Sequence, residues 1–129
     1  MEFGIKDSSY IMAGSKPGLE FLVSQFYQQM DTLKQAQKIR HMHPIDLSES
    51  EDKLVCFLSG WLGGPKLYKE KYGSISIPRA HQHLLISETE KDAWLLCMQK
   101  ALEKTDYSPA FKQYLLTQLA QPASRCVNT

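Results

Sequence analysis

Residues 81–98 read HQHLLISETEKDAWLLCM and contain the strongest structural signal in this chain of 129 residues. Ser87 followed by Glu90 is a capping box, in which two side chains satisfy free backbone N–H groups at a helix start. Apolar residues then recur at helical spacing, and we expect an inward face made of Ala93, Trp94, Cys97, Met98, Ala101 and Leu102. The stretch therefore predicts an amphipathic helix that begins near Ser87, with His81 in a short segment just before it.

A second amphipathic helix is predicted upstream, beginning at Leu19 after a break at Pro17-Gly18. Its apolar residues recur every three or four positions: Leu19, Leu22, Val23, Phe26, Tyr27, Met30 and Leu33. Pro44 disfavours helical geometry at the residue before it, so the chain should turn near His43.

Two further helices are predicted from their end signals. Ser48 and Glu51 read as another capping box, ahead of a helix that Gly63-Gly64-Pro65 should end. Ser108-Pro109 reads as an N-cap and first-turn proline for a last helix that stops near Pro122. Residues 66–79 show no sustained period and read as a long loop, in which only 74–77 alternates as a strand would. The sequence thus predicts the all-α class.

The composition favours one domain, residues 1–129, with a flexible tail from about residue 123. A net charge of +1 gives no electrostatic reason to bind nucleic acid or an anionic membrane. The sequence shows neither a signal peptide nor a membrane-length apolar run, so we expect a cytoplasmic protein. Three cysteines without a C-x-x-C pair argue against a zinc knuckle or a disulfide framework; Cys56 and Cys97 read as core thiols and Cys126 as a tail thiol.

The four histidines form two pairs, His41/His43 and His81/His83. On strands, each H-x-H pair would share a face, and together the pairs could form a non-haem metal site. In helical or turning segments, each pair would supply at most one ligand. A helical interaction module without a cofactor is a third reading, in which Tyr27 and Trp94 are core aromatics. No nucleophile elbow, phosphate loop or H-E-x-x-H pattern is present.

The order and spacing of these features resemble the group II truncated haemoglobins. The resemblance extends from about Tyr10 to Met98, with Tyr10 and Gly14 suggesting a short first helix. The motifs that carry it are Phe26-Tyr27, Pro44 before a capped helix, Gly63-Gly64-Pro65, and His81 ahead of Asp92-Ala93-Trp94-Leu95. In this family the histidine thirteen residues before the tryptophan of a D-A-W-L run is the iron ligand, which is the position of His81 here.

The resemblance implies a two-over-two helical sandwich around haem b, with His81 as the proximal iron ligand. It implies a polar distal group of Tyr27, His43 and Trp94. Apolar side chains near the porphyrin would be Phe26, Leu54, Phe57, Leu58 and Leu84, the last in place of a usual phenylalanine. Ser50 would occupy the site where many globins place a distal histidine. Candidate partners for the haem propionates are Lys66, Tyr68, Lys71 and Arg79, whereas His83 has no family role.

The function implied by the resemblance is binding of O2, NO or CO. Donors such as the Tyr27 hydroxyl and the Trp94 indole N–H should slow the escape of oxygen, which favours chemistry of O2, NO or peroxide over bulk oxygen transport. Nitric oxide dioxygenase or peroxidase-like turnover would need an external reductase, because no flavin or nicotinamide motif is present. We expect a monomer or a weak homodimer.

Overall fold

The computed structural model describes residues 2–74 and 76–129, and all of the regular elements in these ranges are helices. The elements are α1 (Ser8–Met12), α2 (Ser15–Thr32), the 3-10 helix η1 (Lys34–Ala36), α3 (Gln37–His41), α4 (Ser48–Trp61), α5 (Leu67–Tyr72), α6 (Ile77–His81), α7 (Glu88–Glu103) and α8 (Pro109–Arg125). The prediction of an all-α protein is confirmed. None of the helices formed by the described residues is long and apolar enough to cross a membrane.

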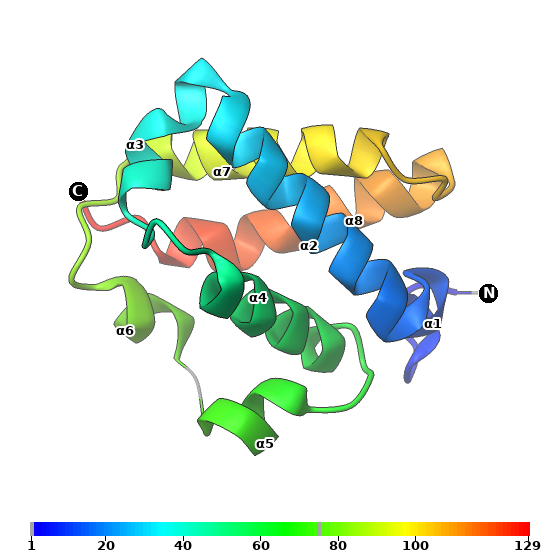
Figure 1. Ribbon diagram of the computed structural model, residues 1–129. Helices are drawn as coiled ribbons and strands as arrows, with labels where there is room; N and C mark the ends of the chain where they lie inside the picture. Colours follow the sequence, from blue (N-terminus) through cyan, green and yellow to red (C-terminus); the bar gives the residue numbers. More distant parts are fainter. Residues whose placement is uncertain (1, 75) are drawn as a thin grey trace.

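The four long helices form two layers. Helix α2 crosses in front of α7 and α8 in Figure 1, with α4 below α8 in this view. Helix α2 packs against both α4 and α7, and α7 packs against α8. The apolar faces predicted for α2, α7 and α8 meet between the layers, where Phe26, Met30, Met98 and Phe111 are almost fully buried. This arrangement is the two-over-two sandwich of a truncated globin, as predicted.

The helix starts were predicted with mixed success. The capping box of α7 is formed, with the Ser87 backbone N–H donating to Glu90 Oε1 at 2.8 Å. The N-cap of α8 is also confirmed, since Ser108 Oγ accepts from the Phe111 N–H at 3.2 Å. The capping box predicted at Ser48 is wrong. Ser48 is already helical, and its N–H donates instead to the carboxylate of Asp46 at 2.9 Å, a short side-chain-to-backbone bond that aspartate makes readily.

Two boundaries set by proline also differ from the prediction. Helix α2 begins at Ser15, so Pro17 lies in its first turn, where a residue without an N–H costs no intrahelical bond. Helix α8 continues through Pro122 to Arg125, because contacts of its end with the rest of the fold outweigh the local effect of proline. Beyond α8, Asn128 bonds to the chain near Ile86. The single-domain organisation and the mobility of the tail stay predictions.

The prediction of one long loop over residues 66–79 is wrong. This stretch contains the short helices α5 and α6, with Gly73 between them at φ 86°. The alternating segment 74–77 includes residue 75, which lies outside the described residues, and Ile77 begins α6. Helix α5 has no buried residue, and Asp52 of α4 holds it by accepting from Lys71 Nζ at 2.7 Å and from the Tyr72 hydroxyl. Short helices with no buried face leave no hydrophobic period in the sequence.

Candidate functional site

A cavity of about 440 Å³ lies among α3, α4, α6, α7 and α8. It brings together nine residues that the sequence proposed for the site: Tyr27, His43, Ser50, Leu54, Phe57, Tyr68, His81, Leu84 and Trp94. These residues come from α2, from α4 to α7 and from the connections after α3 and α6, so the fold assembles in one place side chains far apart in the sequence.

His81 ends the short helix α6 and is half-buried at the cavity wall. Its Nδ1 lies 2.7 Å from the carbonyl oxygen of Ile77, one turn earlier. Because a carbonyl can only accept, Nδ1 carries the proton and Nε2 keeps its lone pair. The imidazole is therefore held in the tautomer that can bind a metal through Nε2.

His43 repeats this arrangement after α3, with Nδ1 2.8 Å from the carbonyl oxygen of Ile39. Burial lowers the pKa of His43 below its usual value; the charges of Arg40 and His81 act in the same direction, and the Ile39 carbonyl opposes them. The His43 ring contacts Tyr27 edge to face, with centroids 5.7 Å apart. A neutral imidazole next to a phenol thus lines the same cavity as His81.

Phe26 packs against both Tyr27 and Trp94 on the side away from the cavity. The Phe26 ring is fully buried and lies 4.9 Å from the ring of Tyr27 and 5.0 Å from that of Trp94, so it supports the cavity without lining it. The Tyr27 hydroxyl donates a long bond of 3.4 Å to the Ser50 carbonyl. Burial and the nearby charge of Glu51 raise the pKa of Tyr27 above its usual value, so the phenol stays protonated and able to donate.

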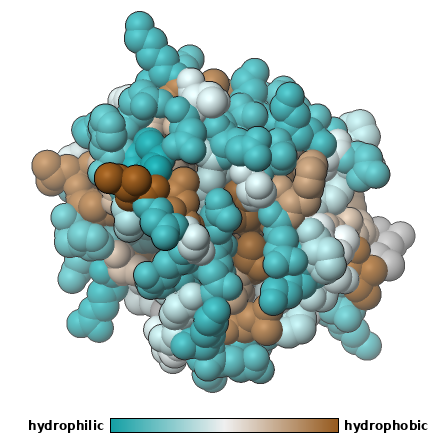
Figure 2. All heavy atoms as spheres, in the orientation of Figure 1, coloured by the Kyte–Doolittle hydropathy of each residue, from teal (hydrophilic) through white to brown (hydrophobic). Residues whose placement is uncertain are grey.

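The remaining wall suits a flat apolar group with a charged edge. Leu54, Phe57 and Ile77 supply apolar surface. Lys53 and Lys91 also line the cavity, and each carries an ammonium group. Figure 2 shows hydrophobic residues exposed over the connection between α3 and α4, where Ile45 is almost completely exposed beside the cavity-lining Pro44. An imidazole with a free Nε2, apolar walls and nearby cations together fit a haem with its propionates.

Some proposed residues do not line this cavity. Phe26 and Leu58 belong to the buried core, and Lys66 and Arg79 are exposed away from the lining. Lys71 pairs with Asp52 instead.

Sequence reasoning missed residues that only the tertiary fold brings to the cavity: Ile39, Met42, Pro44, Lys53, Ile77, Ala80, Ile86, Glu90, Lys91, Leu119, Pro122, Ala123 and Cys126. Lys53 could have been found, because it lies one helical turn before Phe57 and so on the same helix face. The contribution of α8 had no signal in the sequence.

The four-histidine alternative is not favoured. His41 is exposed and does not line the cavity, whereas His43, His81 and His83 do. Within residues 2–74 and 76–129, no three side chains of histidine, cysteine, aspartate or glutamate come together as a metal-binding group. Cys56 and Cys97 are buried, Cys126 is half-buried, and all three thiols are free.

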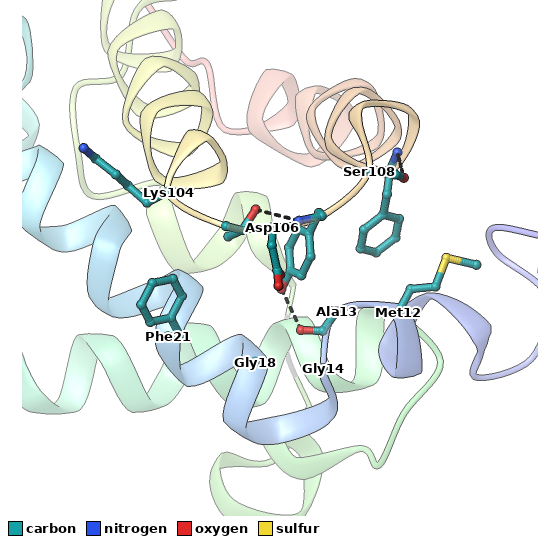
Figure 3. Close-up of a pocket in the computed structure, with 11 residues that line it drawn as sticks. Met12, Ala13, Gly14, Gly18, Phe21, Lys104, Asp106 and Ser108 are labelled. Atoms are coloured by element: carbon teal, nitrogen blue, oxygen red, sulfur yellow. Dashed lines mark hydrogen bonds between the residues drawn. The ribbon is translucent and has the colours of Figure 1, made fainter.

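A second cavity, of about 690 Å³, lies at another part of the molecule. Figure 3 shows Met12, Ala13, Gly14 and Gly18 on one side of it and Lys104, Asp106 and Ser108 of the α7–α8 connection on the other. The Tyr107 hydroxyl donates to the Ala13 carbonyl at 2.6 Å, and burial raises the pKa of Tyr107 to about 12. This cavity is larger but has no histidine in its lining, so the smaller one is the candidate site.

Comparisons with known proteins agree with this geometry. Residues 8–128 match the family described as Bacterial-like globin. The chain is 31% identical over 110 residues to the group 2 truncated hemoglobin YjbI of Bacillus subtilis, which covers 85% of this chain and 81% of that protein.

Solved structures show the same fold. The truncated hemoglobin of the Antarctic bacterium Pseudoalteromonas haloplanktis aligns with a TM-score of 0.90 at 31% identity, over 94% of this chain and 98% of that one. The group II 2-on-2 hemoglobin of Agrobacterium tumefaciens aligns with a TM-score of 0.87 at 35% identity, over 93% of each chain. An oxygen-avid truncated haemoglobin from Bacillus subtilis aligns with a TM-score of 0.83 at 31% identity, over 93% and 98%.

Proposed function

Because this chain belongs to the bacterial-like globins and, within them, to the group II truncated haemoglobins, we propose that its cavity holds a haem bound through His81 and takes up O2 and other diatomic ligands. The observation that carries the proposal is the meeting of His81, Tyr27, His43 and Trp94 in one cavity. The chain contains no C-x-x-C-H attachment motif, so we propose haem b, held without covalent bonds to cysteine.

A haem in this cavity would supply an iron able to bind an imidazole and a diatomic ligand. The role of His81 is to present Nε2 to the iron, and the Ile77 carbonyl fixes both the tautomer and the direction of the ring. Leu54, Phe57 and Ile77 would contact the apolar porphyrin. Lys53 and Lys91 are cations of the lining that would turn from Glu49 and Glu88, with which they pair here, to meet the propionates. Tyr68 also lines the cavity and adds a hydroxyl.

The distal side chains act on the ligand. Tyr27, His43 and Trp94 offer hydrogen-bonding groups, of which the Trp94 indole can only donate. Because donors attract negative charge, the Tyr27 hydroxyl and the Trp94 N–H would retain O2 more strongly than CO. The Bacillus subtilis relative with 31% identity is described as oxygen-avid, which supports the same behaviour here.

Slow release suits a protein that uses oxygen rather than one that carries it. We therefore propose a role in O2, NO or peroxide chemistry, with electrons supplied by an external reductant. The expected cytoplasmic location and a monomer or weak homodimer belong to the same proposal.

The test is an absorption spectrum of the full chain with haem in its ferric, ferrous and CO-bound forms. We expect an intense Soret band and a CO-shifted ferrous spectrum. His81→Ala should lose the spectrum of an imidazole-bound iron, whereas the matched control His83→Ala should keep it. A chain that cannot be loaded with haem contradicts the proposal, and a colourless protein that retains another metal supports the histidine-pair alternative.

A further inference from the structure

The chain between α6 and α7 forms part of the cavity wall. Leu84 and Ile86 line the cavity, whereas Leu85 between them is 72% exposed. Leu84 and Ile86 thus face the cavity while Leu85 faces outward, an alternation of side chains like that along a strand. This wall segment, residues 84–86, follows directly after the helix that carries His81.

Asn128 bonds to both ends of the wall segment. Its Oδ1 accepts from the Ile86 N–H at 2.9 Å, and its Nδ2 donates to the Leu84 carbonyl at 2.7 Å. Its own backbone N–H donates to the Ile86 carbonyl at 2.8 Å. Figure 1 shows the chain after α6 passing beside the C-terminal end, where these bonds form.

The Asn128 side chain bonds to the backbone of the wall segment as the peptide groups of a neighbouring strand would. A carboxamide has the same donor and acceptor as a peptide group, so it can pair with an extended backbone. The wall segment lies outside the helices, and Asn128 satisfies three of its backbone groups. Without this pairing, those groups could bond only to water or to a rearranged chain.

The pairing also joins two walls of the cavity. Pro122, Ala123 and Cys126 of the α8 end line the cavity on one side, and Leu84 and Ile86 line it on the other. Helix α6 has five residues and none of them is buried, so its own packing does little to fix His81. The Ile77 carbonyl orients the His81 ring within α6, so the position of α6 itself depends on the chain that follows it.

We propose that Asn128 is a positioning residue for the haem cavity, which fixes the wall segment, and with it His81, against the end of α8. The pairing itself rests only on the geometry. Its effect on the iron ligand rests on the proposed function.

The test compares Asn128→Ala with the wild-type chain. Alanine removes both the acceptor of the Ile86 N–H and the Nδ2 donor to the Leu84 carbonyl, while the backbone N–H of residue 128 stays. Thr129→Ala is the control, because the Thr129 bond to Ile86 uses only its backbone N–H. Three quantities are measured on the haem-loaded full chain: amide hydrogen exchange of the peptide spanning 82–87, transfer of haem to excess apomyoglobin, and the iron–histidine stretching band of the ferrous form.

We expect Asn128→Ala to speed exchange at Ile86 and haem transfer by about fivefold each, the effect of losing one net hydrogen bond. The iron–histidine band should shift or broaden, while Thr129→Ala leaves all three quantities at wild-type values. Unchanged exchange would show that the pairing is absent. Faster exchange with unchanged haem transfer and an unchanged iron–histidine band would show that the pairing does not position His81.

The two proposals fail in different ways. If the wild-type chain takes up no haem, the proposed function fails. In that case the exchange measurement on the same chain still decides whether Asn128 pairs with the wall segment.

Discussion

Replacing Trp94 by phenylalanine should release oxygen from the ferrous haem protein faster. The change removes one N–H from the cavity and keeps an aromatic ring near Phe26, whose centroid lies 5.0 Å from that of Trp94. Tyr27 cannot fully substitute, because its hydroxyl must give up the bond to the Ser50 carbonyl before it can serve a ligand. A neutral hydrogen bond is worth about 1 kcal/mol net, and one to a charged acceptor about 1.5–3 kcal/mol. The oxygen dissociation rate should therefore rise by about fivefold at least, and by up to about a hundredfold.

The assay is stopped-flow displacement of oxygen by excess CO. Trp61→Phe is the matched control, since Trp61 is another half-buried indole, stacked on Phe57, but outside the cavity lining. CO dissociation should change much less than oxygen dissociation in Trp94→Phe, because CO carries less negative charge. An unchanged oxygen rate in Trp94→Phe, or an equal rise in Trp61→Phe, refutes the assignment of Trp94 as a donor to the ligand.

Three further predictions concern the scaffold. Gly18→Ala would place a Cβ 1.8 Å from the Ala13 carbonyl oxygen, so the free energy of unfolding should fall by about 1–3 kcal/mol, as urea titration would show. Gly60→Ala is the control: the nearest contact of its Cβ would be 3.4 Å, and its free energy of unfolding should change little. Tyr107→Phe removes the bond to Ala13 and should cost about 1 kcal/mol. Burial raises the pKa of Tyr107 from 10.0 to about 12, so between these pH values the unfolded chain loses the phenol proton more readily than the folded chain does. Wild-type stability should therefore fall as pH rises across this interval, and the stability of Tyr107→Phe should fall less. Urea midpoints at mildly and strongly alkaline pH would show the difference. Asp52→Asn should speed tryptic cleavage in α5 at neutral pH, where wild-type Asp52 is charged because Lys71 and Tyr72 hold its pKa below the usual value. Equal cleavage of both proteins would contradict this.

The sequence predicted the parts of the fold that local chemistry determines. The helical periods of α2, α4, α7 and α8 and the end signals at Ser87 and Ser108 depend on residues within a few positions of one another. The all-α class followed from them. The spacing between His81 and Trp94 then pointed to the family, and the fold places both residues at one cavity.

The errors arose where residues close in sequence were not the ones that interact. The spacing of Ser48 and Glu51 predicted a capping box, but the Ser48 N–H donates a hydrogen bond to the Asp46 carboxylate instead. Pro122 looked like a helix end, but α8 continues to Arg125 and lines the cavity there. Lys66 and Arg79, the candidate propionate partners suggested by the resemblance, lie outside the lining, whereas Lys53 and Lys91 of the long helices line the cavity.

The proposed iron ligand, His81, shows why the identity of a residue can be predicted when its position cannot. The Ile77 carbonyl orients the His81 ring within α6, but a helix of five residues without a buried face is not stable alone, so nothing near His81 in the sequence fixes where α6 lies in the fold. Distant contacts hold the segment on both sides: Asp52 secures α5 ahead of it, and Asn128 secures the chain after it. Both contacts are polar and lie partly in solvent, which makes them weaker than the core between α2 and α7. The part of the molecule that opens most easily should therefore be residues 67–86, and haem should be lost through opening of this segment before the long helices unfold.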